Sequence, residues 1–167
     1  TGVLLSTGSR KTGHHKTKGL EMLLYQSVKT IERHFYSIDE IKRAVALRHE
    51  EILKSSSAGG EHIGTPCNTT GDPTGRKIEQ MYDLPNVETA AGTFDKPMKW
   101  IAVFEATQRH FNGLEGDLLI KRYIEKKNVM QICDEIYIAK TTYHYWRENI
   151  LNYATMLAIQ YGLVRVL

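Results

Sequence analysis

The sequence predicts an all-α fold, in which an N-terminal helical hairpin precedes a C-terminal helical bundle. Apolar residues recur at spacings of three and four over most of the chain, which is typical of amphipathic helices. Stretches rich in Ser, Gly and Thr lack this periodicity and separate the helical segments. The 167 residues, of which 41% are hydrophobic, are enough for one core. We expect a flexible basic tail (1–18), a helical hairpin (19–54), a linker (55–72) and a helical domain (73–167).

The basic residues at the start of the chain account for its positive charge. Residues 1–18 contain four lysines and arginines and no acid, and because the net charge of the whole chain is +3, the remainder is near −1. A flexible basic arm can follow the phosphates of a nucleic acid. A solvated end without a role, or an artificial extension, explains the same composition. The net charge therefore gives little support for nucleic-acid binding, and a prediction of such binding depends on how side chains are arranged on individual helices.

Residues 19–54 are expected to form two amphipathic helices separated by a short break. The first has an apolar stripe made of Leu20, Leu24, Val28, Ile31 and Phe35. Ser37 can cap the second helix, with Glu40 as its reciprocal partner. The second helix should bury Ile41, Val45 and Ile52 together with the stem of Arg48. This pattern favours an antiparallel hairpin, and an exposed dimerisation arm is the alternative.

Several classes of protein are not expected from this sequence. The linker contains His62 and Cys67, but zinc sites need about four ligands at defined spacings, so we expect neither a metal site nor a cofactor. No catalytic cluster and no phosphate-binding glycine loop is present, so an enzyme is not expected. No apolar run approaches the ~20 residues that cross a bilayer, which favours a cytoplasmic protein without a membrane partner.

Three further helices are expected in the first part of the helical domain, at about 73–83, 95–112 and 114–125. Asp72-Pro73 opens the first of them, with Asp as the cap and Pro at the first helical position. Asn112-Gly113 ends the second. The residues between these two helices, 85–96, have the composition of turns.

Residues 128–148 predict two short helices joined by a tight turn. Asn128 can cap the first helix, with Gln131 as its reciprocal partner. The buried set expected from the spacing is Ile132, Cys133, Ile136, Ile138, Tyr143 and Trp146, which is the pattern of a helix-turn-helix. A plain helical hairpin within a core is the alternative. Tyr137 stands where the turn often has glycine, and left-handed geometry there costs about 1 kcal/mol, which leaves a turn of another shape open.

The second of these helices should continue from Lys140 to about Tyr161, where Gly162 can end it. Successive residues are 100° apart around a helix. If Tyr143 and Trp146 face the core, the residues on the opposite side of the helix must therefore face solvent. That outward set is Thr141, His144, Tyr145 and Glu148, with Lys140 and Arg147 on its flanks. Hydroxyl, imidazole and phenol groups can reach base edges in a major groove, and flanking cations can reach phosphates. This face predicts a double-stranded DNA partner.

Lys126 and Lys127 precede the capped helix start at Asn128. Two lysines beside the free N–H groups of a helix start can bind a phosphate. A solvated loop is the alternative.

Short motifs in the C-terminal half point to a known class of protein. They are Arg122-Tyr123, Ile132-Cys133, Ile138-Ala139-Lys140-Thr141 and Tyr145-Trp146-Arg147, together with upstream segments at 47–52, 59–60 and 72–74. In these features the chain resembles phage-encoded late-gene transcriptional regulators of the RinA and ArpU type. Those regulators carry a helix-turn-helix similar to region 4 of bacterial sigma factors. The resemblance is good over residues 118–151 and loose over 38–152.

The resemblance implies a phage or prophage protein that acts at the nucleoid in the cytoplasm of a bacterial host. It places base contacts on Lys140, Thr141, His144 and Tyr145. Tyr137 and Glu148 depart from the pattern, because Glu148 on the DNA side repels phosphate unless it accepts a hydrogen bond from a cytosine.

Two alternatives to a sequence-specific regulator remain at this point. One is a small subunit of a phage DNA-packaging machine, which would use the same motif within a ring of copies. The other is a helical protein-interaction scaffold without nucleic-acid binding, with RNA polymerase as a candidate partner. The apolar stripe of the last helix also suits self-association into a homo-oligomer.

Overall fold

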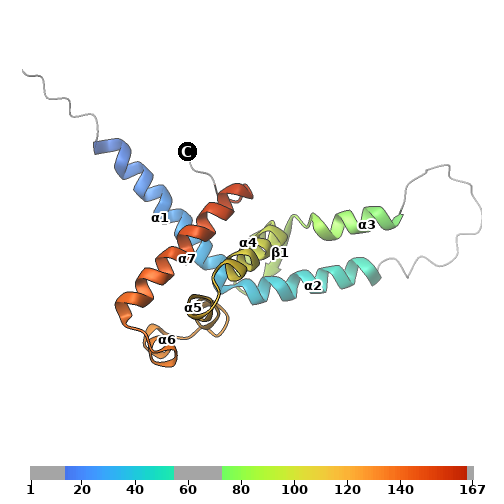
Figure 1. Ribbon diagram of the computed structural model, residues 1–167. Coiled ribbons are helices and arrows are strands. Elements are labelled where there is room, and N and C mark those ends of the chain that lie inside the picture. Colours follow the sequence, from blue (N-terminus) through green and yellow to red (C-terminus); the bar gives the residue numbers. More distant parts are fainter. Residues whose placement is uncertain (1–13, 55–72, 165–167) are drawn as a thin grey trace, which may run out of the picture.

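The computed structural model describes residues 14–54 and 73–164, and this part of the chain is mostly helical (Figure 1). Seven helices and one two-stranded antiparallel hairpin lie within these ranges. In chain order the elements are α1 (His14–Tyr36), α2 (Ile38–Lys54), α3 (Pro73–Tyr82), β1 (Asn86–Thr89), β2 (Gly92–Asp95), α4 (Pro97–His110), α5 (Leu114–Tyr123), α6 (Val129–Ile136) and α7 (Lys140–Gln160).

The hairpin β1–β2 corrects the all-α prediction, because it occupies the segment 85–96 that was expected to contain only turns. Val87 of β1 lies opposite Phe94 of β2, and both side chains are buried with Ile41 and Val45 of α2. The preceding Leu84 belongs to the same small apolar cluster. Since β2 extends to Asp95, α4 begins at Pro97 rather than at Asp95.

The main core joins residues from both ends of the chain. Phe35 of α1 makes edge-to-face contacts with Phe104 of α4 and Tyr123 of α5. Apolar residues of α6 and α7 complete the same cluster. Figure 1 shows α1 crossing α7, while α2 runs beside α3. The two N-terminal helices therefore pack mainly on later helices, and the segment 19–54 shares its core with the segment 73–164.

The structure describes only a short piece of the expected tail and none of the expected linker. Residues 14–18, expected within the tail, belong to the first turns of α1. Residues 1–13, and the whole linker 55–72 with His62 and Cys67, lie outside the described residues.

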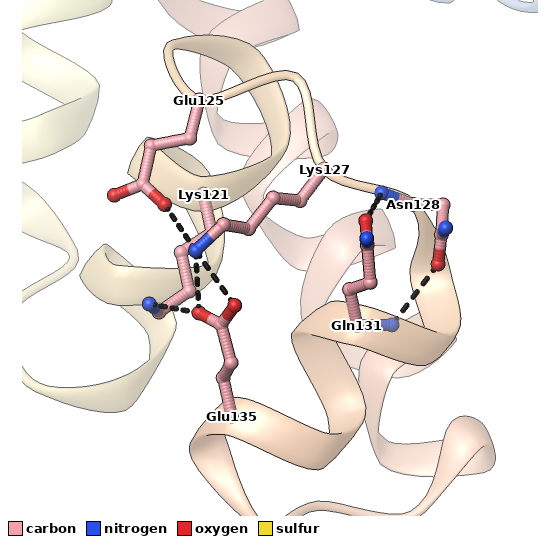
Figure 2. A network of polar contacts seen from close by, with 6 residues as sticks. All are labelled: Lys121, Glu125, Lys127, Asn128, Gln131 and Glu135. Carbon is pink, nitrogen blue, oxygen red and sulfur yellow. Dashed lines mark hydrogen bonds and ion pairs between the residues drawn. The ribbon is translucent and has the colours of Figure 1, made fainter.

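The start of α6 has the predicted capping box. The Asn128 side chain accepts a hydrogen bond from the Gln131 backbone N–H at 3.0 Å, and the Gln131 side chain accepts one from the Asn128 N–H at 3.1 Å (Figure 2). Two donors at the helix start are thereby satisfied. The side chains of Ile132, Cys133 and Ile136 are buried, as their spacing predicts.

The connection between α6 and α7 turns sharply at Tyr137, whose φ of 54° is left-handed. The N–H of Ile138 donates to the carbonyl of Cys133 at 3.1 Å, which closes the end of α6. The left-handed geometry is thus adopted without glycine, and a turn of another shape is not needed.

The helix α7 is continuous for 21 residues, as the uninterrupted periodicity predicts. It ends at Gln160, Gly162 follows the cap residue with a φ of 65°, and the N–H of Leu163 donates to the carbonyl of Ala158 at 2.9 Å. This is a Schellman ending, in which glycine relieves the left-handed position. Among the described residues, no helix is both long and apolar enough to span a bilayer.

Candidate functional site

The first turns of α7 present a polar and aromatic face to solvent. Its exposed residues are Lys140, Thr141, His144, Tyr145 and Glu148. The opposite side of the helix holds Tyr143, which is 1% exposed, and the fully buried Ile150. Because these two side chains are fixed in the core, the rotation of α7 about its axis is fixed as well. The residues expected to contact DNA at the start of α7 therefore lie together on one accessible face.

Arg147 is placed differently from the rest of the predicted set. Its Nη2 and Nε donate to one carboxylate oxygen of Glu32 on α1, at 2.6 and 3.1 Å. The hydroxyl of Tyr123 donates to the same oxygen at 3.3 Å. Burial disfavours the charge of Arg147, but the hydrogen bonds to Glu32 and the attraction of Glu32, Tyr123 and Tyr143 together outweigh it and raise the pKa of the guanidinium. Arg147 thus joins α7 to α1 instead of flanking the exposed face.

Lys127 lies in a network of ion pairs rather than in open solvent (Figure 2). Its ammonium is 2.7 Å from a carboxylate oxygen of Glu125 and 2.7 Å from one of Glu135. Lys121 donates to Glu135 as well. The hydrogen bonds that Lys127 donates to Glu125 and Glu135 raise its pKa to about 12, and the hydrogen bonds that Glu135 accepts from Lys121 and Lys127 lower the pKa of Glu135. A phosphate at Lys127 would therefore compete with two carboxylates.

Lys126 is also paired. Its ammonium lies 3.6 Å from Glu40 of α2, and its backbone is left-handed with φ 55°. Both lysines that were expected to hold a phosphate therefore have acidic partners. The partner of Lys126 is on α2, and those of Lys127 are just before α6 and in α6.

A groove between α1 and α7 borders the exposed face. Its volume is about 510 Å³, and its lining includes Tyr25 and Lys29 of α1 beside His144, Glu148 and Asn152 of α7. The ammonium of Lys29 lies 4.5 Å from the centre of the Tyr25 ring. Sequence reasoning did not assign Lys29 or Tyr25 to the site, because nothing local in α1 indicates that it lies across α7.

Large exposed side chains of α6, of the turn after it and of α7 lie at this end of the molecule. Tyr137 is 94% exposed, and Tyr145 and Met130 are also mostly accessible. No cluster of His, Cys, Asp or Glu suited to a metal ion occurs among the residues that the structure describes. Exposed tyrosines, a histidine and a hydroxyl bind through hydrogen bonds and stacking, and Lys140 has no acidic partner among the described residues.

Comparisons with family models, with curated proteins and with solved structures returned no match to this chain.

Proposed function

We propose that this protein is a sequence-specific regulator that binds double-stranded DNA, with α6 and α7 as its helix-turn-helix. The observation that carries the proposal is the face formed by Lys140, Thr141, His144 and Tyr145 at the start of α7. These side chains point away from a core that holds the other side of the same helix. A helix presented in this way fits the major groove of B-form DNA.

The arrangement of α6 and α7 supports this assignment. α6 has only eight residues, is capped at its start by Asn128, and is joined to α7 by residues 137–139. Ile132 and Ile136 of α6 share the core with Tyr143 of α7. α7 therefore rests on α6 while its own first turns remain accessible, as a recognition helix requires.

Each residue of the face has a chemical role in the proposal. Lys140 has no acidic partner among the described residues and neutralises a phosphate. Thr141, His144 and Tyr145 donate and accept hydrogen bonds at base edges. Glu148, one turn beyond His144, accepts from the amino group of a cytosine. The motif resemblance favours a phage or prophage late-gene regulator as the class of protein.

A selection of bound duplexes from random fragments at low salt tests the proposal, followed by fluorescence anisotropy on the recovered sequence. We expect Lys140→Ala to weaken binding to all sequences alike and to reduce the salt slope by about 1. We expect His144→Ala or Tyr145→Ala to reduce discrimination between bases by about 1–3 kcal/mol.

Matched controls are available on α2 and α3. Arg43→Ala removes an exposed cation from α2, and Tyr82→Ala removes a tyrosine of α3 that is 73% exposed. Both should bind DNA as the wild type does. Recovery of no duplex, or equal losses in the controls and the α7 variants, would contradict the proposal.

The paired lysines favour a second candidate function. With Lys126 and Lys127 neutralised by acids, and with Tyr137 and Met130 exposed nearby, the same end of the molecule suits a protein partner such as RNA polymerase. A chain that recovers no duplex but binds purified bacterial RNA polymerase would support this scaffold function. Light scattering that shows a discrete ring of many copies, together with duplex binding, would instead favour the packaging subunit.

A further inference from the structure

Tyr137 combines a strained backbone with a side chain that gains little from folding. Its backbone is left-handed, where a side chain with a Cβ is strained and glycine is not. Its side chain is 94% exposed, so the aromatic ring gains little from packing. A glycine at this position would form the same turn without the strain.

The other non-glycine residues with positive φ in the described part of the chain are Lys96 and Lys126, and they differ from Tyr137. The ammonium of Lys96 donates to the carbonyl of Gly162, and that of Lys126 pairs with Glu40. Their side chains therefore have partners within the fold. The backbone N–H of Tyr137 donates to the carbonyl of Cys133, but its side chain has no hydrogen bond or ring contact to any described residue. Residues with a strained backbone cluster at functional sites, where the side chain contributes to binding and not to the stability of the fold.

We infer that Tyr137 is a DNA-contacting residue, whose ring lies against the sugar-phosphate backbone and whose hydroxyl donates to a phosphate oxygen. This inference rests on the proposed DNA-binding function. It is favoured by position, because Tyr137 precedes Lys140 by three residues and so lies at the same end of α7 as the exposed face. Tyrosine hydroxyls are among the groups that bind DNA phosphates and set the register of a protein on the duplex.

Three substitutions separate this role from a role in folding. Tyr137→Gly and Tyr137→Asn both tolerate the left-handed turn, so the melting temperature should stay unchanged or rise by about 2–4 °C. Both should weaken duplex binding by about tenfold, the effect of one lost contact. Tyr137→Phe removes only the hydroxyl, and it should weaken binding to specific and nonspecific duplexes by the same factor.

Tyr82→Phe is the matched control, since it removes the hydroxyl of an exposed tyrosine on α3. It should leave duplex binding at the wild-type level. If the wild type binds DNA and the three Tyr137 variants bind equally well, the inference is overturned while the proposed function stands. A lower melting temperature in both Tyr137→Gly and Tyr137→Asn also overturns it, because the side chain then serves the fold. If the wild type binds no duplex, the proposed function and the inference fail together.

Discussion

The hydroxyl groups of two buried tyrosines are satisfied differently. Tyr123 donates to Glu32, whereas the hydroxyl of Tyr143 has no hydrogen-bond partner among the described residues. Both rings are 1% exposed and belong to the same core. Burial raises the pKa of both phenols, so both are neutral donors under ordinary conditions. The ring of Tyr143 stabilises the fold, while its hydroxyl is desolvated without compensation.

Replacing each tyrosine by phenylalanine should therefore have opposite effects on stability. We expect Tyr143→Phe to raise the free energy of unfolding by about 1 kcal/mol, because an unsatisfied polar group is removed. We expect Tyr123→Phe to lower it by about 1 kcal/mol, because a hydrogen bond to a carboxylate is lost. Urea denaturation measures both values. A destabilised Tyr143→Phe variant would show that the hydroxyl has a partner.

Burial within one helix was easier to predict than contacts between helices, although Trp146 is only half-buried and Arg48 is exposed where both were expected to be buried. The apolar spacing predicted a buried Tyr143, and from it the 100° step predicted that Thr141, His144 and Tyr145 are exposed, as they are. Sequence reasoning also placed the reciprocal cap of Asn128 and Gln131. It did not predict the partner of Arg147, because Glu32 is 115 residues earlier in the chain and no local pattern connects them.

At the scale of elements, the contact between Arg147 and Glu32 is a polar link between α1 and α7. Both side chains are largely buried, with 30% and 20% of their surface exposed. Removing one partner leaves the other charge partly buried without compensation, which costs more than the loss of an exposed pair.

We expect Glu32→Gln and Arg147→Gln each to destabilise the protein by about 1–3 kcal/mol. The double variant should be less destabilised than the sum of the two, and the coupling energy follows from the double-mutant cycle. Lys42→Gln is the comparison, since it breaks a more exposed pair with Glu105 of α4, and its effect should stay below about 1 kcal/mol. Additive effects of Glu32→Gln and Arg147→Gln in urea denaturation would disprove the link.

The helices were predictable as elements, but the hairpin and the packing partners were not. Five or more apolar residues repeat along α1 and α7, so their periodicity is strong. The strands β1 and β2 have four residues each and bury one side chain apiece, Val87 and Phe94, which is too little to show alternation. The expected pairing of α1 with α2 followed from their closeness in the chain. In the structure the helices are separated at Ser37, and they pack on different elements: α1 on α7, and α2 on α4 and β1.

At the scale of the whole molecule, the ion pairs around α6 reduce the positive charge available to a polyanion. The net charge is only +3, and Lys121 and Lys127 share the carboxylate of Glu135. These pairs connect the end of α5 to α6, so they order the segment before Asn128 (Figure 2). The same contacts oppose the binding of a phosphate at this place.

Glu135→Gln should therefore strengthen duplex binding, by about threefold to tenfold at low salt, and should make its salt dependence steeper. Fluorescence anisotropy over a range of salt concentrations measures both quantities. Glu88→Gln is the matched control, because it removes one exposed negative charge from β1, away from α6. The same gain in both variants would mean that net charge alone is responsible, and a loss of affinity in Glu135→Gln would mean that the pairs position the interface.

α7 has the exposed candidate face at its start and buried side chains along its other side as far as Ala158. Over its 21 residues it spans about 30 Å, from the exposed Lys140 to Ala154 and Ala158, which are fully buried. Because α7 is one continuous helix, a ligand that binds its first turns also restrains the buried residues further along it. DNA binding and thermal stability are therefore linked. A duplex that binds the folded protein and not the unfolded chain raises the melting temperature by mass action.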